Sequence, residues 1–510
     1  MLALNSLFEL VKTLDIHEKR YLMGKGKKIG NGQSAYLKML DAIYKMKEYD
    51  ENELRNVFSS VSNSNKLDVK KHYLYYWILN HLNEYHGKNY HSHRNIQQVQ
   101  LLLDRSLVNH AKQLISTIKG DIIKTENYLE ILSLLEKELT IQKYKNGFDS
   151  LKILEEIEFF SNHYKDLKAV EFIKLNFRKI LDYNMFSRTI EVEEQINYLF
   201  GGKIKKLRIS SDSFLVGFNF NLLYYWKYAS ENNWGNAYKY ALNNYHLLLA
   251  NPDKIRYFPE FSMHILYNLL NAASITGKGI YTQVLKKMKE LIAQQKNKRI
   301  QQDGLFYLYV SNLIHLNRNK TKFLKSKLVV ESYQFIERHK HSFSNIRLNN
   351  FYFDLAKSYY YLSDFRKAFS VLNEMYQNFY SKDYTIDFNS HSRFLYCFVC
   401  FELGEYDLLI STAKSIADFM KRNGILFKFE KKMIRFIINE LPILLEKPIE
   451  ARRKKMEKLK MDITTIFESS YERKVLNYFQ GKRSLQLQQR SKVKRQELPH
   501  LSLLMVKSAF

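Results

Sequence analysis

The sequence predicts an all-α fold made of antiparallel helical hairpins, and three observations support this fold class. Proline is rare: the 510 residues contain five, and the first 251 residues contain none. Proline breaks helix interiors and glycine weakens them, so a long chain with so few prolines and only 17 glycines favours helices throughout. Apolar residues recur at positions i, i+3, i+4 and i+7, the spacing of one helix face. This hairpin pattern returns at several places along the chain.

The clearest hairpin lies within residues 352–375, YFDLAKSYYYLSDFRKAFSVLNEM. Its first predicted helix presents one apolar face, formed by Tyr352, Leu355, Ala356 and Tyr359. Ser363 and Asp364 interrupt the pattern, and an aspartate at this point can cap the next helix. The second predicted helix repeats the spacing with Phe365, Ala368, Leu372 and Met375. The two alanines let the helix backbones approach, so most of the aromatic side chains are expected to fill space in the core.

Three further segments carry the same arrangement in whole or in part: 401–416 FELGEYDLLISTAKSI, 228–244 YASENNWGNAYKYALNN and 105–118 RSLVNHAKQLISTI. Large apolar residues at these spacings, with small residues between them and a turn in the middle, resemble the tetratricopeptide (TPR) repeat. Met375 stands where the TPR pattern has a small residue. The equivalent leucines Leu362 and Leu403 are 41 positions apart, against roughly 34 in a TPR. The resemblance therefore implies an irregular TPR-like α-solenoid, in which neighbouring hairpins cover one another's apolar faces.

A wider resemblance is to a group of bacterial, Bacteroidota-type, TPR-like helical repeat proteins. It is carried by HEKRYL (17–22), AYLKMLDAIYKMKEYDENELRNVF (35–58) and KHYLYYWILNHLNEYH (71–86), and it extends over about residues 5 to 479. The resemblance implies a helical repeat fold and brings no activity with it.

Four parts of the chain are predicted. They are an N-terminal helical cap or bundle (1–90), a TPR-like repeat array (91–446), a basic C-terminal helix (447–479) and a poorly ordered basic tail (480–510). Helices are expected at about 35–47, 51–58 and 69–87. A cap covers the open end of a repeat array, which such arrays need for solubility. The three helices also fit a helix-turn-helix DNA reader, with Lys70 and Lys71 near the start of its last helix.

The net charge of +28 leaves two interpretations open. A basic excess is the electrostatic footprint of a polyanion-binding protein. Residues 447–510 hold 16 lysines and arginines against 6 acids. Alternatively, the joint abundance of Lys, Asn, Ile, Tyr and Phe reflects an AT-rich genome, and the charge is then ordinary solvated surface. The candidate polyanion contacts are Lys70, Lys71, Arg452, Arg453, Lys454 and Lys455.

Three features suggest site chemistry, and for each the sequence favours a plainer interpretation. The segment GKGKKIGNG (24–32) has neither the spacing of a Walker loop nor that of a dinucleotide fingerprint, so a flexible basic loop between helices is expected. Cys397 and Cys400 lie in the middle of a predicted helix and are too few for a structural zinc, so core packing is expected. No metal-binding motif accompanies His81, His86, His91 and His93. We therefore expect a non-catalytic protein without a metal or a cofactor.

The expected location is the cytoplasm. The N-terminus lacks a basic segment before its apolar stretch, which argues against a signal peptide. No window approaches the length of apolar sequence that a membrane span needs. Two cysteines suit a reducing compartment.

In TPR-like repeats the first helix of each hairpin lines a concave groove and carries the ligand contacts. The corresponding positions are candidates for protein binding: Asn350, Phe353, Lys357, Tyr360, Tyr361, His391, Phe394 and Trp226. Aromatic side chains dominate binding hot spots, and the alternative is that several of them pack against adjacent hairpins. We expect a non-catalytic protein–protein interaction scaffold that binds a peptide or a partner helix. The alternative is a nucleic-acid-associated regulator that uses the N-terminal helices or the basic C-terminal end.

Overall fold

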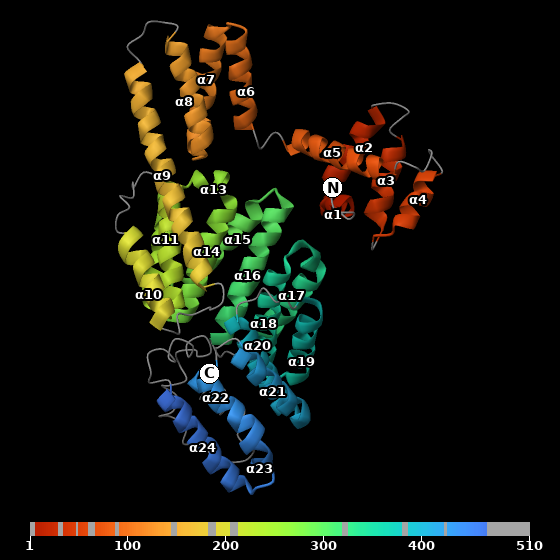
Figure 1. Ribbon diagram of the computed structural model, residues 1–510, viewed down its shortest axis with the longest axis vertical. Helices are drawn as coiled ribbons and strands as arrows, with labels where there is room; N and C mark the ends of the chain where they lie inside the picture. Colours follow the sequence, from red (N-terminus) through yellow and green to blue (C-terminus); the bar gives the residue numbers. More distant parts are fainter. Residues whose placement is uncertain are drawn as a thin grey trace. The chain divides into compact units, whose positions relative to one another are not determined.

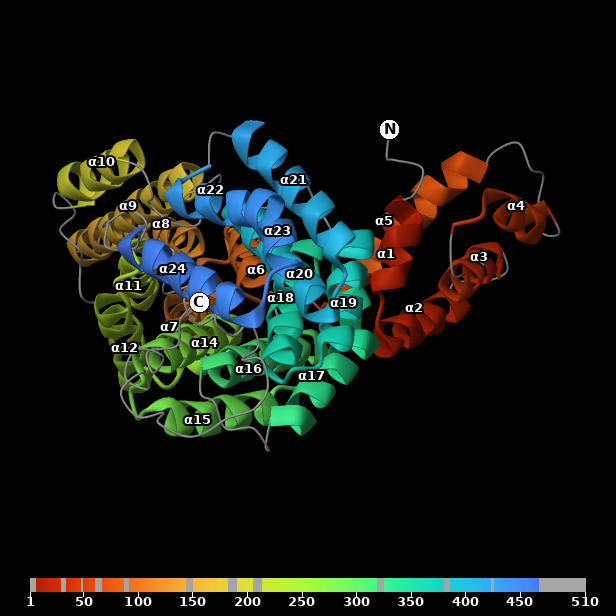
Figure 2. The same cartoon turned by 90° about the horizontal axis from the view of Figure 1, so that it is seen from below.

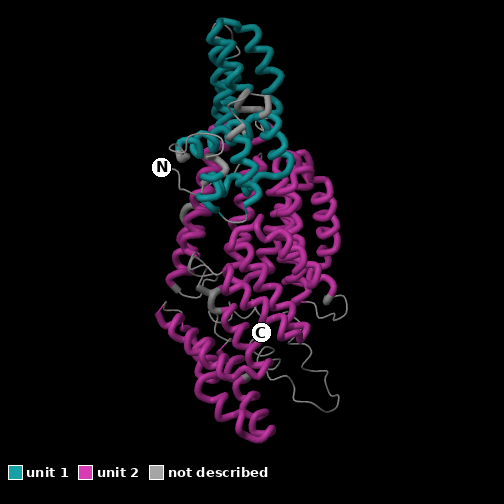
Figure 3. Tube along the Cα trace, turned by 90° about the vertical axis from the view of Figure 1, so that its right-hand side faces the viewer, with its two compact units in different colours: residues 1–123, 127–158 teal, residues 124–126, 159–510 magenta. Residues whose placement is uncertain are grey.

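The computed structural model describes residues 6–28, 34–46, 49–59, 67–86, 91–143, 150–181, 190–204, 213–318, 325–379, 386–422 and 426–466. Within these ranges the regular elements are helices and no strand occurs, so the predicted all-α fold class is confirmed (Figures 1 and 2). The chain forms two compact units (Figure 3): unit 1 holds residues 1–123 and 127–158, and unit 2 holds residues 124–126 and 159–510. No helix in the described ranges is long and apolar enough to cross a membrane.

Unit 1 contains the helices of the N-terminal part of the chain. They are α1 (Ser6–Thr13), α2 (Ile16–Lys28), α3 (Ser34–Lys45), α4 (Glu51–Ser59), α5 (Leu67–His86), α6 (His91–Asp104), α7 (Val108–Lys124) and α8 (Tyr128–Lys143), and α9 (Ser150–Leu181) begins there. The three helices predicted near residues 35–87 correspond to α3, α4 and α5. Helices α1 to α5 share one core, which includes Val11, Leu22, Leu40, Ile43, Leu74 and Ile78.

The glycine-rich segment is helical in its first half, so the predicted loop over residues 24–32 is wrong for residues 24–28. Helix α2 runs through Gly24 and Gly26 to Lys28, and residues 29–33 lie outside the described ranges. Gly26 is buried, and a Cβ placed on it would lie 2.3 Å from a methyl carbon of Leu37 in α3. The glycine therefore allows α2 and α3 to approach closely, which outweighs its low helix propensity.

Replacing these two glycines with alanine should have opposite effects. Gly24 is exposed, and a Cβ there meets nothing within 4 Å, so Gly24→Ala is expected to raise the free energy of unfolding by about 0.5–1 kcal/mol. Gly26→Ala should lower it by about 1 kcal/mol or more, because Leu37 must move. Urea unfolding of both variants measures the difference. A stabilising Gly26→Ala would contradict the close α2–α3 contact.

Unit 2 is a series of helical hairpins. Its helices are α10 (Ile190–Tyr198), α11 (Phe214–Ser230), α12 (Trp234–Ala250), α13 (Lys254–Tyr257), α14 (Pro259–Thr276), α15 (Tyr281–Gln294), α16 (Lys298–Arg318), α17 (Lys325–His339), α18 (Asn345–Tyr361), α19 (Phe365–Glu374), α20 (Ile386–Leu403), α21 (Tyr406–Arg422), α22 (Lys428–Arg435), α23 (Leu441–Leu445) and α24 (Ile449–Ile466). Residues 159–181 of α9 also belong to it. Short π-helical turns cover Leu199–Lys203, Met375–Phe379 and Phe436–Glu440, and a 3-10 turn covers Lys340–Ser342.

Consecutive hairpins of unit 2 contact each other. The pairs are α11/α12, α14/α15, α16/α17, α18/α19 and α20/α21, and the two helices of each pair are called its first and second helix. First helices also contact one another across hairpins: α14 contacts α16, α16 contacts α18, and α18 contacts α20. Second helices reach the next hairpin through α12–α14, α15–α16, α17–α18 and α19–α20 contacts. Each hairpin thus covers an apolar face of the next.

The four segments with the repeat pattern share one turn geometry. A residue with positive φ ends the first helix at Ser106, Asn232, Ser363 and Gly404, with φ between 57° and 78°. In the third of these turns Asp364 N donates to the Tyr359 carbonyl at 3.0 Å, and the Asp364 carboxylate accepts from Lys367 N at 3.2 Å. The backbone bond satisfies an end carbonyl of one helix and the side chain caps the next, so only three residues, 362–364, separate the two helices.

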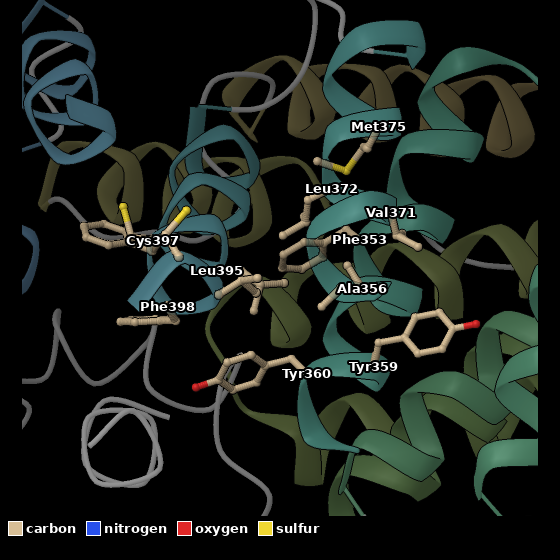
Figure 4. Close-up of a cluster of buried hydrophobic side chains, with 14 of the residues drawn as sticks. Phe353, Ala356, Tyr359, Tyr360, Val371, Leu372, Met375, Leu395, Cys397 and Phe398 are labelled. Atoms are coloured by element: carbon tan, nitrogen blue, oxygen red, sulfur yellow. The ribbon is translucent and has the colours of Figure 1, made fainter. Parts of the chain in front are cut away.

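Seven of the eight predicted repeat positions of residues 352–375 are buried, and the eighth, Phe365, is half-buried against the same core. Tyr352, Leu355, Ala356 and Tyr359 of α18 are buried, and Ala368, Leu372 and Met375 that follow are buried too. Figure 4 shows Phe353 and Ala356 of α18 gathered with Leu372 of the second helix and Leu395 of the next first helix. The aromatic side chains therefore mainly fill space between hairpins.

The predicted C-terminal basic helix includes α24, which ends at Ile466. Residues 467–479 of this predicted helix, and the whole predicted tail 480–510, lie outside the described residues. The predicted boundaries at 90 and 446 stay predictions, because the compact units divide the chain by contacts and the first unit extends to residue 158.

Candidate functional site

The first helices α14, α16 and α18 lie side by side and are linked by side-chain hydrogen bonds. Ser311 Oγ donates to Asn271 Oδ1 at 3.3 Å. Ser358 Oγ donates to Asn317 Oδ1 at 2.8 Å, and Asn317 Nδ2 donates to the backbone oxygen of Asp354 at 3.2 Å. Buried polar contacts that are satisfied in this way rigidify a structure and fix one arrangement of its helices.

A row of half-buried polar and aromatic side chains accompanies these links and is called the polar row below. Its members are His264 and Tyr267 of α14, Tyr307 and Arg318 of α16, and Asp354, Lys357 and Tyr361 of α18. A half-buried side chain is held by its neighbours and still meets solvent. The polar row is therefore a part of the first helices that a ligand can reach without displacing the core.

The centre of the polar row is aromatic. The ring centroids of Tyr267 and Tyr307 are 4.7 Å apart, and the His264 ring lies 6.1 Å from Tyr307 and 6.3 Å from Tyr267. The guanidinium of Arg347 lies 5.3 Å from the Tyr307 centroid and forms an ion pair with Asp303. Aromatic and cation–π contacts at these distances are attractive, so the rings are held in place before any ligand arrives.

The other end of the polar row is charged and poorly solvated. Burial raises the pKa of Asp354 to about 6, although the charges of Lys357 and Arg318 oppose this shift. Burial likewise lowers the pKa of Lys357 to about 8, with Asp354 opposing and Arg318 adding to the change. Burial raises the pKa of Tyr361 to about 12. Desolvation thus outweighs the attraction between the opposite charges, so these groups gain from any partner that replaces their lost solvation.

Asp354→Asn should stabilise the protein at neutral pH and have little effect near pH 4. The carboxyl titrates near pH 3.8 in the unfolded chain and near 6 in the folded one, so the folded state binds more protons between these values and stability falls as pH rises through them. Asparagine removes this loss, and we expect a gain of about 1 kcal/mol at pH 7, after allowance for solvent screening. Urea unfolding at both pH values measures it. An equal difference at the two pH values would contradict the desolvation of Asp354.

The sequence-predicted binding residues occupy different environments. Four of them are buried, in agreement with the alternative that they pack against adjacent hairpins: Phe353, Tyr360, His391 and Phe394. Asn350 is exposed. Lys357 and Tyr361 belong to the polar row. Trp226 is half-buried on α11, beneath the Arg178 guanidinium at 5.3 Å.

Most of the candidate polyanion contacts form hydrogen bonds or ion pairs with other residues of the protein. Lys71 is 8% exposed, donates to Tyr49 Oη at 2.9 Å and lies 3.6 Å from the Glu51 carboxylate, while Lys70 is half-buried. On α24, Lys455 pairs with Glu440 at 2.8 Å. Arg452 donates to the Leu445 and Lys447 carbonyls, and Arg453 pairs with Glu457 at 3.3 Å. Lys454 is exposed.

The two cysteines are buried within α20, as expected for core residues. Burial raises the pKa of the Cys397 thiol well above its usual value and that of Cys400 to about 12, so neither is a reactive thiolate at neutral pH. The ring of His81 packs on Trp77 at 4.3 Å, and its Nδ1 lies 2.9 Å from the Trp77 carbonyl. The side chains of His86, His91 and His93 lie outside the described part of the structure.

Sequence reasoning missed His264, Tyr267, Tyr307, Arg318 and Asp354. Residues 259–318 lack the repeat signature, so α14 and α16 were not recognised as first helices. The contacts of α14 with α16 and of α16 with α18 show that both are first helices. Once α14 and α16 are aligned with α18, these positions can be identified.

Within the described ranges, no three His, Cys, Asp or Glu side chains are placed to hold a metal ion. The polar row offers aromatic faces, one arginine, one lysine and one aspartate, which suit reversible binding through stacking and charge-assisted hydrogen bonds. Comparison of the chain with protein-family models, with curated proteins and with solved structures finds no match.

Proposed function

We propose that this chain is a non-catalytic protein–protein interaction scaffold. Its hairpins form an irregular TPR-like array related to the bacterial helical repeat proteins that the sequence resembles, and it binds a peptide segment or helix of a partner protein along the polar row. The observation that carries the proposal is the polar row itself: three adjacent first helices present half-buried aromatic and charged side chains beside a closed apolar core.

The chemistry of the polar row supports peptide binding. Tyrosine and arginine are enriched among the few residues that dominate the binding energy of protein interfaces. The contacts among Tyr267, Tyr307 and Arg347 hold the rings in place, so binding immobilises few further rotamers. The hydrogen bonds between first helices keep the spacing of the row fixed.

The protein is proposed to act in the cytoplasm. Cys397 and Cys400 are both free thiols inside the core, and a protein that folds with reduced cysteines suits a reducing compartment.

Quantitative affinity capture from the host tests the proposal. The bait carries Lys357→Met and Tyr361→Ala, which remove a charge and a ring from the polar row. A matched control carries Lys414→Met and Tyr406→Ala on the second helix α21, where both side chains are exposed. We expect the row variant to lose its specific partner by about tenfold or more, as for hot-spot residues, and the control to retain it.

Thermal unfolding of each bait shows whether it is folded. If the row variant is folded and captures every partner at the wild-type level, the polar row is not the binding surface and the proposal fails.

A further inference from the structure

Three side chains, Lys174 and Arg178 of α9 and His264 of α14, each contact residues of α11 in unit 2. Lys174 and Arg178 lie one turn apart on α9, on the same helix face. Lys174 Nζ donates to Asn219 Oδ1 of α11 at 2.8 Å. The Arg178 guanidinium lies 5.3 Å from the ring centroid of Trp226. His264 of α14 contacts the same helix α11, because its ring lies 6.4 Å from that of Phe218, the neighbour of Asn219.

The positive charge at this place is not neutralised by a direct ion pair in the described structure, although Glu171 of the same helix is close enough to act on Lys174. Neither Lys174 nor Arg178 forms an ion pair within 4.0 Å with a described residue, and Glu171 of the same helix is paired with Lys168 at 2.9 Å. Burial, then Lys174 and Arg178, lower the pKa of His264 to about 4. Burial also lowers the pKa of Lys174, with Glu171 opposing and Arg178 adding.

A half-buried amine whose hydrogen-bond acceptor is an amide oxygen is oriented without being neutralised. Lys174 is half-buried, whereas Arg178 is exposed with its guanidinium over Trp226. The remaining N–H groups of both side chains are available to a ligand, since lysine has three donors and arginine five. The Lys174 ammonium loses solvation on folding, and a bound anion compensates for that loss.

We propose that Lys174, Arg178 and His264 form a binding site for an oxyanion, either a phosphate or a carboxylate group. The fork of donors in arginine matches two oxygens of such a group, and the lysine amine adds a point charge. His264 donates one N–H in its neutral form and gains a proton as the anion binds. The anion comes from a free phosphate compound or from an acidic side chain of the bound partner. A free phosphate compound needs no peptide, so the site does not depend on the proposed function.

Titration calorimetry on the full chain in phosphate-free, low-salt buffer tests the site with two probes. One probe is inorganic phosphate and the other is a short glutamate-rich peptide with blocked ends. The site variants are Arg178→Gln and Lys174→Met. The control, Lys414→Met with Lys421→Met, removes two exposed positive charges of α21. We expect at least one probe to bind, each site variant to weaken it about tenfold, and the control to leave it unchanged.

The probes separate the two sources of the anion. Phosphate binding that the site variants abolish identifies a phosphate ligand, and binding of the glutamate-rich peptide alone identifies a carboxylate. In both cases we expect the NMR signal of the His264 imidazole to shift when the probe binds. That signal is assigned as the one missing from the spectrum of His264→Gln. Binding that the control weakens as much as the site variants comes from general surface charge and overturns the proposal, as does no binding of either probe. If Lys174→Met unfolds, Arg178→Gln decides, because Arg178 is exposed.

Discussion

Replacing Glu126 with glutamine is expected to lower the free energy of unfolding by about 3–5 kcal/mol. The Glu126 carboxylate accepts hydrogen bonds from Phe214 N at 3.1 Å and Leu215 N at 2.9 Å, at the start of α11, and from Ser213 Oγ at 2.9 Å. It also pairs with Lys254 Nζ at 2.6 Å, and both side chains of this pair are buried. Glutamine leaves the Lys254 ammonium buried without a carboxylate, and it removes the charge that caps the positive end of α11.

Chemical denaturation of the full chain measures this effect. Glu136→Gln is the matched control, because Glu136 is an exposed glutamate of α8, and we expect it to change stability by less than about 0.5 kcal/mol. Lys254→Met in the Glu126→Gln background should recover part of the loss, because no unpaired charge remains buried. A Glu126→Gln protein as stable as its control would show that the pair is not buried in solution.

Ala356→Leu is expected to lower the free energy of unfolding by about 3 kcal/mol, the upper end of the usual cost of overpacking a core. Ala356 of α18 and Ala368 of α19 have no accessible surface, and the two helices contact each other. The extra atoms of leucine must push apart helices that are packed at crystal-like density. Ala293→Leu on α15 is the control, because Ala293 is exposed, and it should be nearly neutral. If the two variants unfold at the same denaturant concentration, the hairpin is looser than described.

The hairpins could be predicted from the sequence because their signals are local. Ala356, Asp364 and Ala368 lie within a single segment of 13 residues, and their spacing alone predicts two helices, a cap and a close contact. The prediction at Gly26 was wrong for the same reason. Glycine normally weakens a helix, and the local sequence does not show that Gly26 packs against Leu37 of the next helix. Propensity is a weak guide where tertiary packing decides.

The binding surface could be predicted only in part. Periodicity shows that Phe353 and Tyr360 share a helix with Lys357 and Tyr361, and it does not show how much of that helix is covered. Helices α16 and α20 both contact α18, so its buried face is wide and only a narrow strip remains half-buried. The contacts of Glu126 with Ser213 and Lys254 join residues 87 and 128 positions apart, and no local pattern predicts a pair at such separation.

Site-specific photo-crosslinking in the host tests most directly whether the polar row holds a partner. A benzoylphenylalanine replaces Tyr361 in the row, and in a control protein it replaces Ser415, which is exposed on α21. We expect position 361 to give a discrete adduct with one partner, position 415 to give none with that partner, and Lys357→Met to weaken the adduct at 361. Equal adducts from the two positions, or an adduct at 361 that Lys357→Met leaves unchanged, would contradict the assignment of the polar row as the partner-binding surface.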